Sequence, residues 1–202
     1  MGETDYDIVA MFNRSGARRD GHFTLASGRC GLVFLDAWYL YTYPEHRDRL
    51  FRRLANKLFL YEGEPPIDVL IGPERGAIWL VEGVTGVIWR ETGRTILSMF
   101  AEKDKSRPGE KYAFKIPERW AGRLSGKRVG IIEDVSTTGG SPAAVARLVE
   151  ECGGIPVLTI TIWNRGNVTA EDIGVPKLVS LVNQEFPSYG PDECPRHVEE
   201  NK

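Results

Sequence analysis

The stretch RVGIIEDVSTTGGS, residues 128 to 141, says most about how this chain folds. Val129, Ile131 and Ile132 near its start are β-branched and form a short continuous apolar run. Such a run predicts a strand buried on both faces of a parallel sheet. Glu133 and Asp134 stand where we expect this strand to end. Neighbouring side chains of a regular strand point to opposite faces, so both carboxylates can serve one ligand only if the chain leaves the ladder there.

A turn rich in hydroxyl groups and glycines follows the two acids. Gly139 and Gly140 allow backbone amides to approach a ligand closely. Ser141 followed by Pro142 predicts an N-cap and the first residue of a helix, whose positive end suits a phosphate dianion. An ordinary strand, turn and helix would explain each part alone. The fold alone does not require two adjacent acids beside such a loop, so we interpret the run as a site for a phosphorylated sugar.

Length and composition predict one α/β domain that spans residues 1–202. A formal charge of −2 gives no sign of a nucleic-acid partner. No apolar stretch is long enough for a membrane span, and the first residues lack the order of a secretory signal. The three cysteines are odd in number and widely spaced, which favours reduced thiols and a cytoplasmic location.

Strand and helix patterns alternate along the chain, as in a parallel sheet covered by helices on both sides. We expect helices at residues 6–14, from Pro44 onward, at 75–93 and after the glycine turn through Glu151. We expect two strands within residues 22–35, and single strands at 67–72, 94–100, 128–134, 156–163 and 177–182. Residues from about 62 to 168 form the predicted core. Residues from about 1 to 45 and 175 to 202 form a predicted hood over the carboxyl ends of its strands, where open α/β sheets bind ligands.

A second glycine-flanked turn, IGPERGA at residues 71–77, follows an earlier core strand. It places Arg75 where a guanidinium can meet an anion, although an ordinary turn with an exposed arginine would explain it equally well. Glu74 is unexpected beside a polyanion unless Mg²⁺ or a neighbouring base offsets its charge.

The run 128–141 closely resembles the signature by which type I phosphoribosyltransferases bind phosphoribosyl pyrophosphate (PRPP), and 71–77 resembles their pyrophosphate loop. Three shorter motifs are similar to those of orotate phosphoribosyltransferases. GHFTLASGR at residues 21–29 resembles their hood, FAEK at 100–103 the strand that enters their mobile loop, and WNRG at 163–166 the strand end that supplies an arginine to the orotate ring. The resemblance covers about residues 15 to 197.

This resemblance implies the type I phosphoribosyltransferase fold, with a central, mostly parallel sheet flanked by helices and a small hood. It implies that the two acids hold the ribose hydroxyls and that the loop after them holds the 5′-phosphate. The residues thereby assigned to PRPP are Arg75, Lys103, Lys105, Arg107, Glu133, Asp134, Val135, Ser136, Thr137, Thr138, Gly139, Gly140 and Ser141. Those assigned to the base are Phe23, Ser27, Thr137 and Arg165, and those assigned to catalysis are Lys103, Lys105 and Asp134.

The implied activity is that of a pentosyltransferase in pyrimidine biosynthesis. It transfers the phosphoribosyl group of PRPP to orotate, with Mg²⁺ as a cofactor held mainly through PRPP rather than by a protein metal site. The polar span from about Lys103 to Glu110 is expected to be a lid, although a flexible linker has a similar composition. In this family a loop lysine serves the site of the partner subunit, so a homodimer is implied.

Three departures from the family pattern leave other interpretations open. Ala26 stands where some relatives carry a hood lysine, and the loop contains lysines whose register against the family pattern is open. Cys194-x-x-His197 replaces a C-P-x-C ending, and two potential ligands do not make a four-ligand zinc site, so we predict none there. The chain could instead act on a purine or another pyrimidine. It could also be a non-catalytic regulator of the same fold that senses PRPP.

Overall fold

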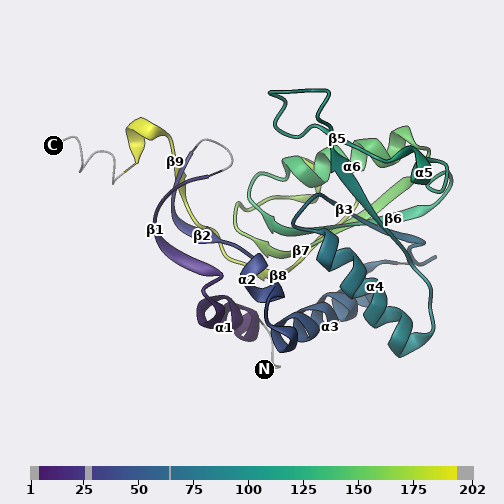
Figure 1. Ribbon diagram of the computed structural model, residues 1–202, viewed down its shortest axis with the longest axis horizontal. Coiled ribbons are helices and arrows are strands. Elements are labelled where there is room, and N and C mark those ends of the chain that lie inside the picture. The colour runs from purple at the N-terminus through teal and green to yellow at the C-terminus, as the bar shows by residue number, and fades with distance from the viewer. Residues whose placement is uncertain (1–4, 26–28, 64, 195–202) are drawn as a thin grey trace.

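The computed structural model describes residues 5–25, 29–63 and 65–194. Its main sheet has the strand order β5-β4-β3-β6-β7-β8, and all neighbouring strands are parallel except the pair β4 and β5 (Figure 1). The predicted α/β class with a mostly parallel sheet is therefore confirmed. The strands are β3 (Val69–Pro73), β4 (Leu97–Lys103), β5 (Phe114–Lys115), β6 (Arg128–Ser136), β7 (Ile155–Asn164) and β8 (Leu178–Asn183).

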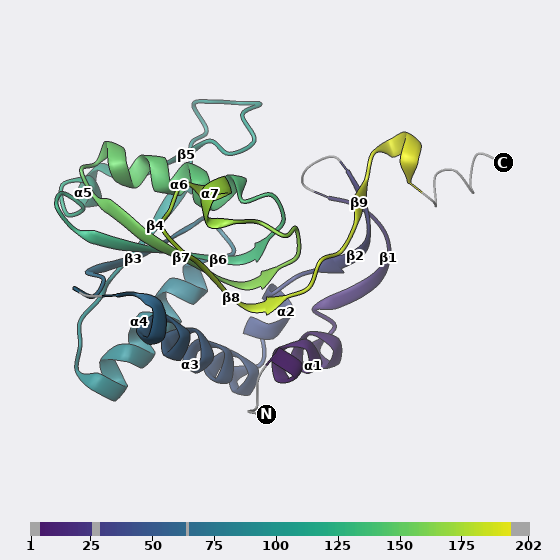
Figure 2. The same cartoon turned by 180° about the vertical axis from the view of Figure 1, so that it is seen from behind.

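Helices cover both faces of this sheet (Figures 1 and 2). One face carries α3 (Pro44–Tyr61) and α4 (Ile78–Thr92), and the other carries α5 (Glu118–Ala121), α6 (Gly140–Glu151) and α7 (Ala170–Ile173). Alternating side chains of the strands pack against the helices on the two faces. Ile132 belongs to the buried cluster with α3 and α4, and Ile131 belongs to the buried cluster with α6. None of the described helices has the length and apolarity that a membrane crossing needs.

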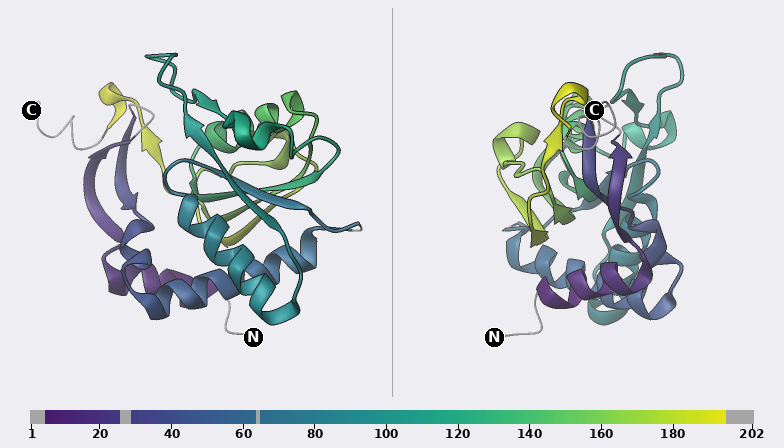
Figure 3. Two further views of the ribbon diagram at one scale, coloured as in Figure 1. Left: turned by 45° about the vertical axis from the view of Figure 1, so that its right-hand side comes forward. Right: turned by 90° about the vertical axis from the view of Figure 1, so that its left-hand side faces the viewer.

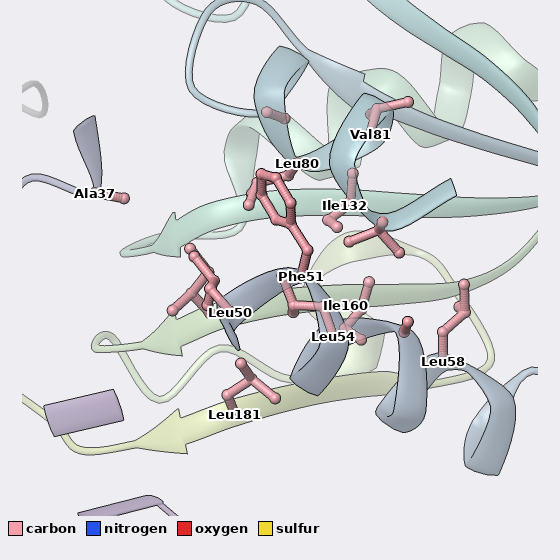
Figure 4. Packing of buried hydrophobic residues seen from close by; sticks show 14 of the residues in the cluster. Ala37, Leu50, Phe51, Leu54, Leu58, Leu80, Val81, Ile132, Ile160 and Leu181 are labelled. Atoms are coloured by element: carbon pink, nitrogen blue, oxygen red, sulfur yellow. The ribbon is translucent and has the colours of Figure 1, made fainter. Parts of the chain in front are cut away.

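Apolar residues recur at helical spacing after Pro44, which predicts one apolar stripe made of Leu50, Phe51, Leu54, Leu58 and Phe59. Most of this stripe is buried against the sheet and α4. Leu50, Leu54 and Leu58 of α3 are fully buried and, with Phe51, pack toward Leu80, Ile132 and Ile160 (Figure 4). Phe59, which we assigned to the same stripe, is exposed instead. It lies past the buried arc of the helix, where the guanidinium of Arg94 covers its ring at 5.8 Å.

A second, antiparallel sheet in the order β1-β2-β9 stands beside the carboxyl ends of the main strands (Figure 3). It consists of β1 (Arg18–Thr24), β2 (Cys30–Leu35) and β9 (Ser188–Tyr189). Helices α1 (Asp5–Ser15) and α2 (Trp38–Tyr41) flank it, and a short 3-10 helix, η1 (Pro191–Glu193), follows it. The sequence placed the carboxyl-terminal part of the hood from about residue 175, but β8 belongs to the main sheet, so this part begins after Asn183.

Helix α6 begins earlier than its sequence predicted. Its N-cap is Gly139, whose φ of 72° lies in the left-handed region that glycine adopts easily, so the chain turns there and not at Ser141. Ser141 and Pro142 therefore lie inside the first turn of the helix, and the prediction that Ser141 caps it was wrong.

The packing of α3 against α4 depends on a glycine. A β-carbon at Gly83 would overlap the ring of Phe51, whereas one at Gly86 would meet only the flexible end of Arg90. We expect Gly83→Ala to lower the free energy of unfolding by about 1–3 kcal/mol, because the helices must separate. Urea denaturation measures this, with Gly86→Ala as the control that should change stability by about 1 kcal/mol at most. Equal losses in both variants would contradict this packing.

Candidate functional site

A cavity of about 260 Å³ opens where β6 gives way to α6. All nine residues from Glu133 to Ser141 line it, so the structure brings together the whole signature that we assigned to PRPP. Arg165 lines it as well, whereas Phe23 does not, and Ser27 lies outside the described residues. The remaining lining residues are Leu25, Phe34, Leu35, Lys111, Tyr112 and Pro142.

The two acids reach this cavity although the strand does not end at them. We expected β6 to stop at Glu133 and Asp134, but it stays paired with β7 as far as Ser136. Its pairing with β3 stops at Ile131, so the acids lie where the strand has lost one of its two neighbours. Both carboxyl groups also bond locally: Glu133 Oε1 accepts from the amide of Asp134 at 3.2 Å, and Asp134 Oδ1 accepts from the amide of Val135 at 2.7 Å.

Burial disfavours the ionised forms of the acidic side chains at this end of the cavity. Burial and then the charge of Asp134 raise the pKa of Glu133 well above its ordinary value. Burial also raises the pKa of Asp134, although its hydrogen bond with Glu133 partly offsets the effect. Burial and both carboxylates raise the pKa of the Tyr41 phenol, which donates to the carbonyl of Gly76 at 3.3 Å. A ligand that brings hydroxyl donors or a cation would stabilise the ionised acids.

The loop after the acids is enclosed on two sides. Tyr112 and Thr138 share a hydrogen bond of 2.8 Å between their hydroxyl groups, and a β-carbon at Gly140 would overlap the ring of Tyr112. A β-carbon at Gly166 would overlap the carbonyl of Thr137. The loop therefore lies between the polar span before β5 and the end of β7. At the start of α6 backbone amides lack helical acceptors, which makes this loop suitable for a phosphate group.

Arg165 brings an incompletely paired cation to the same cavity. Its side chain is 3% exposed, Nη1 donates to the carbonyl of Val33 at 2.9 Å, and its guanidinium lies 5.5 Å from the ring centre of Phe186. Nε and Nη2 have no hydrogen-bond partner among the described residues. Burial lowers the pKa of this arginine. Buried donors without acceptors are costly, so an anion of the ligand would be a favourable partner.

The turn after β3 packs against the acids, but its own charged side chains point elsewhere. Gly76 lies so close to Asp134 that a β-carbon there would overlap its carboxylate. Glu74, whose charge seemed unexpected in the sequence, accepts a hydrogen bond of 2.9 Å from the amide of Lys103 and so ties this turn to the end of β4. Arg75 is exposed and does not line the cavity.

The polar span between β4 and β5 forms a projecting loop, visible at the top of Figure 1. A hydrogen bond of 2.9 Å from the amide of Asp104 to the carbonyl of Ala113 closes its base. Lys103 and Lys105 line a separate hollow beside Glu74, and Arg107 bonds to Asp104 within the loop. The structure thus does not bring these three predicted cations into the cavity of the signature loop.

Lys111 and Tyr112 occupy that position instead. Both line the cavity, and the ammonium group of Lys111 lies 4.9 Å from the ring centre of Tyr112. Sequence reasoning gave neither a role, because the register of the lysines in the loop was open. The apolar wall of Leu25, Phe34 and Leu35 was missed as well, since only the pairing of β1 with β2 brings it to the end of β6.

Comparison with known proteins identifies the class to which this fold and site belong. Residues 45–192 match the family model of the phosphoribosyl transferase domain, so the chain belongs to the phosphoribosyltransferases, which are pentosyltransferase enzymes. Curated relatives narrow this to one kind of phosphoribosyltransferase. The orotate phosphoribosyltransferase of Phenylobacterium zucineum is 32% identical over 191 residues, which cover 94% of this chain and 89% of the relative. That of Pelotomaculum thermopropionicum is also 32% identical, over 94% of this chain and 90% of the relative.

Solved structures share the fold at lower identity. Orotate phosphoribosyltransferase from Mycobacterium tuberculosis, in complex with inorganic phosphate, has a TM-score of 0.62 and 24% identity, and the alignment covers 90% of this chain and 96% of that one. Adenine phosphoribosyltransferase from Saccharomyces cerevisiae has a TM-score of 0.61 and 22% identity, with 86% and 99% covered. The fold is therefore common to enzymes named for different bases.

The buried acid makes stability depend on pH in a testable direction. Because the pKa of Glu133 is raised on folding, its stabilising contribution is complete below the ordinary pKa of 4.5 and is lost as pH rises through the raised value. Glu133→Gln removes this ionisation, so we expect unfolding at neutral pH to cost more, by on the order of 1 kcal/mol. Urea denaturation across a pH series measures it.

The control for this variant is Glu150→Gln, which changes an exposed carboxylate on α6 in the same way. It should leave both stability and its pH dependence unchanged. A destabilised Glu133→Gln protein at neutral pH would mean that the charged form of Glu133 is an essential structural partner, and that its burial does not oppose folding.

Proposed function

We propose that this protein is an orotate phosphoribosyltransferase, which converts PRPP and orotate to orotidine 5′-monophosphate and pyrophosphate in cytoplasmic pyrimidine biosynthesis. One observation carries the choice of base: the buried guanidinium of Arg165 lines the same cavity as the acidic pair and the phosphate-type loop, and two of its donor nitrogens are unpaired within the described part of the chain. Orotate is a nucleobase with a carboxylate, and the names of the curated relatives support the same choice.

The cavity has a suitable group for each part of the sugar phosphate. The amides and hydroxyl groups of residues 137–141 would bind the 5′-phosphate at the start of α6. Glu133 and Asp134 would accept hydrogen bonds from the ribose hydroxyls, which compensates the acids for their burial. These interactions fix the ribose at both ends and leave its C1′ carbon to face the base.

Transfer requires the bond between C1′ and the pyrophosphate oxygen to break while the base nitrogen approaches. Positive charge then develops on the ribose ring, as in glycoside cleavage. The protein needs no covalent nucleophile for this step, because alignment of the reactants and fixed charges lower the barrier. The negative carboxylates of the acidic pair, close to the ring, would stabilise that developing charge.

Mg²⁺ suits this site because the ion prefers oxygen ligands and is commonly held through substrate phosphates. Among the described residues that line the cavity, the carboxylates are those of Glu133 and Asp134. We propose that PRPP supplies most of the ligands and that these carboxylates stabilise the bound ion. When bound, the ion would supply positive charge that offsets the negative charge of the departing pyrophosphate.

Arg165 would select the base by its charge and shape. A guanidinium can grip a carboxylate with two parallel hydrogen bonds, and Nε with Nη2 is one such pair of donors. A base without a carboxylate would leave these buried donors unpaired. Phe23, which we assigned to the base, has its ring 5.4 Å from that of Phe34 and would act by supporting this wall of the cavity.

A panel of bases tests the proposal. The protein is incubated with Mg²⁺, PRPP and, separately, orotate, uracil, hypoxanthine, guanine and adenine, and pyrophosphate release is measured. We expect turnover with orotate and with none of the other four bases. Arg165→Lys should lower kcat/KM for orotate by roughly tenfold to a hundredfold, because the paired donors are lost.

Arg123→Lys, an exchange of an exposed arginine, is the matched control and should retain full activity. The KM for PRPP should be unchanged in both variants. Turnover with another base would instead identify a phosphoribosyltransferase of different specificity. Binding of PRPP without turnover of any base would identify a regulator.

We further propose a homodimer in which the loop lysines act on the site of the partner subunit. Lys103 and Lys105 line a hollow apart from their own cavity, where they could reach a second copy. Two large aromatic side chains of α4, those of Trp79 and Trp89, are exposed. Such side chains are enriched at protein interfaces.

Hybrid dimers test this arrangement. Lys103→Ala and Asp134→Asn should each abolish most activity, yet their co-expression should restore about one quarter of it, because half of the dimers then hold one intact site. Co-expression of Lys103→Ala with Lys105→Ala is the control and should restore nothing. A monomer by light scattering, or no gain from the first pair, would contradict the proposal.

A further inference from the structure

Three side chains with metal-binding atoms meet beside the small sheet, and none of the three lines the cavity proposed for PRPP. They are His22 of β1, Cys30 at the start of β2 and Cys194 directly after η1. One ligand atom from each lies within 4.8 Å of the others, and His22 Nε2 is 3.4 Å from Cys194 Sγ. His22 and Cys194 are 172 positions apart in the sequence, so only the folded chain brings the three together.

We infer that His22, Cys30 and Cys194 form a zinc site that joins the two ends of the chain. This inference goes beyond the proposed enzyme activity and does not depend on the nucleobase. The sequence alone showed only Cys194 and His197 as possible ligands, and we therefore predicted no site. The structure adds an imidazole and a second sulfur to Cys194, which changes that conclusion.

The geometry and the donor set fit Zn²⁺. In tetrahedral sites Zn–S is about 2.3 Å and Zn–N about 2.0–2.1 Å, which places a sulfur and a nitrogen ligand about 3.6 Å apart. The observed 3.4 Å is close to this value. Cys30 and Cys194 are 2% and 0% exposed, so an ion here would be shielded from water on the sulfur side. Thiolate with imidazole is a ligand combination typical of zinc.

The backbone around the cluster is built to bring the ligands together. The register of β1 with β2 shifts between Asp20 and Phe23, and such a bulge re-aims the side chains within it, here that of His22. Arg29, the neighbour of Cys30, donates to the side chain and the carbonyl of Ser188 at 3.1 and 2.6 Å. These bonds hold the segment that leads to Cys194 against β2.

Two cysteines in contact could alternatively form a disulfide, but both are thiols in this structure. In a reducing compartment, which we propose for this protein, cysteine clusters bind metals more often than they form disulfides. Three protein ligands leave the fourth position of a tetrahedral ion for another donor.

A zinc ion here would stabilise the wall of the base pocket. Leu25 lines the PRPP cavity and lies between His22 and Cys30 in the sequence. Fixing both ends of this hairpin segment to the carboxyl-terminal segment would hold that wall in place. The predicted role is structural, so zinc should raise Tm rather than take part in the reaction.

Metal content of the full-length protein tests the inference. The protein is purified under reducing conditions and without chelators, and zinc per chain is measured by plasma mass spectrometry. Cobalt added to the metal-stripped protein provides a second readout, because thiolate ligands give a charge-transfer band in the near ultraviolet. We expect one ion per chain, a thiolate band, and a lower Tm after the metal is stripped.

Cys30→Ser and Cys194→Ser should each weaken zinc binding by about a hundredfold or more and abolish the band. Cys152→Ser, which changes the remaining cysteine at the C-cap of α6, should change neither. Wild-type protein that binds no zinc and shows no band would overturn the inference, whether or not the variants fold. An intact mass lower by two hydrogens, with Cys30 linked to Cys194, would overturn it as well.

Discussion

The site depends on a single constraint: two adjacent carboxyl groups must face one cavity from one strand. A strand inside a sheet cannot present neighbours in this way, because its pleat sends them to opposite faces. Here β6 loses its partner β3 after Ile131 and keeps its partner β7 as far as Ser136. One side of the strand is therefore open where Glu133 and Asp134 lie, and Gly76 approaches Asp134 from the turn that replaces the missing partner.

The surrounding elements supply the other binding groups of the site. The glycine turn into α6 supplies amides beside the acids, and the end of β7 supplies Arg165. The small sheet encloses the cavity from the carboxyl ends of the strands and also satisfies Arg165 in part, through the carbonyl of Val33. Binding a sugar phosphate and a carboxylated base would satisfy the groups that remain costly in their absence, namely the buried acids and the unpaired guanidinium nitrogens.

Local sequence patterns predicted the helices and strands well, but they did not predict the contacts between distant parts of the chain. The apolar run of β6 and the stripe of α3 follow from residue type and spacing, so both were found from the sequence. The start of α6 was misplaced, because Gly139 turns the chain before the expected cap at Ser141. Lys111 and Tyr112 were missed because the path of a long loop depends on distant residues such as Thr138. The cluster of His22, Cys30 and Cys194 had no local signal, since its members lie at opposite ends of the chain.

A crystal structure with bound orotidine 5′-monophosphate tests the role of the acidic pair most directly. We predict the phosphate at the amides of residues 137–141, the ribose hydroxyls on Glu133 and Asp134, and the carboxylate of the base on Arg165. A nucleotide bound elsewhere, or bound here with its ribose turned away from both acids, would contradict this assignment of the site.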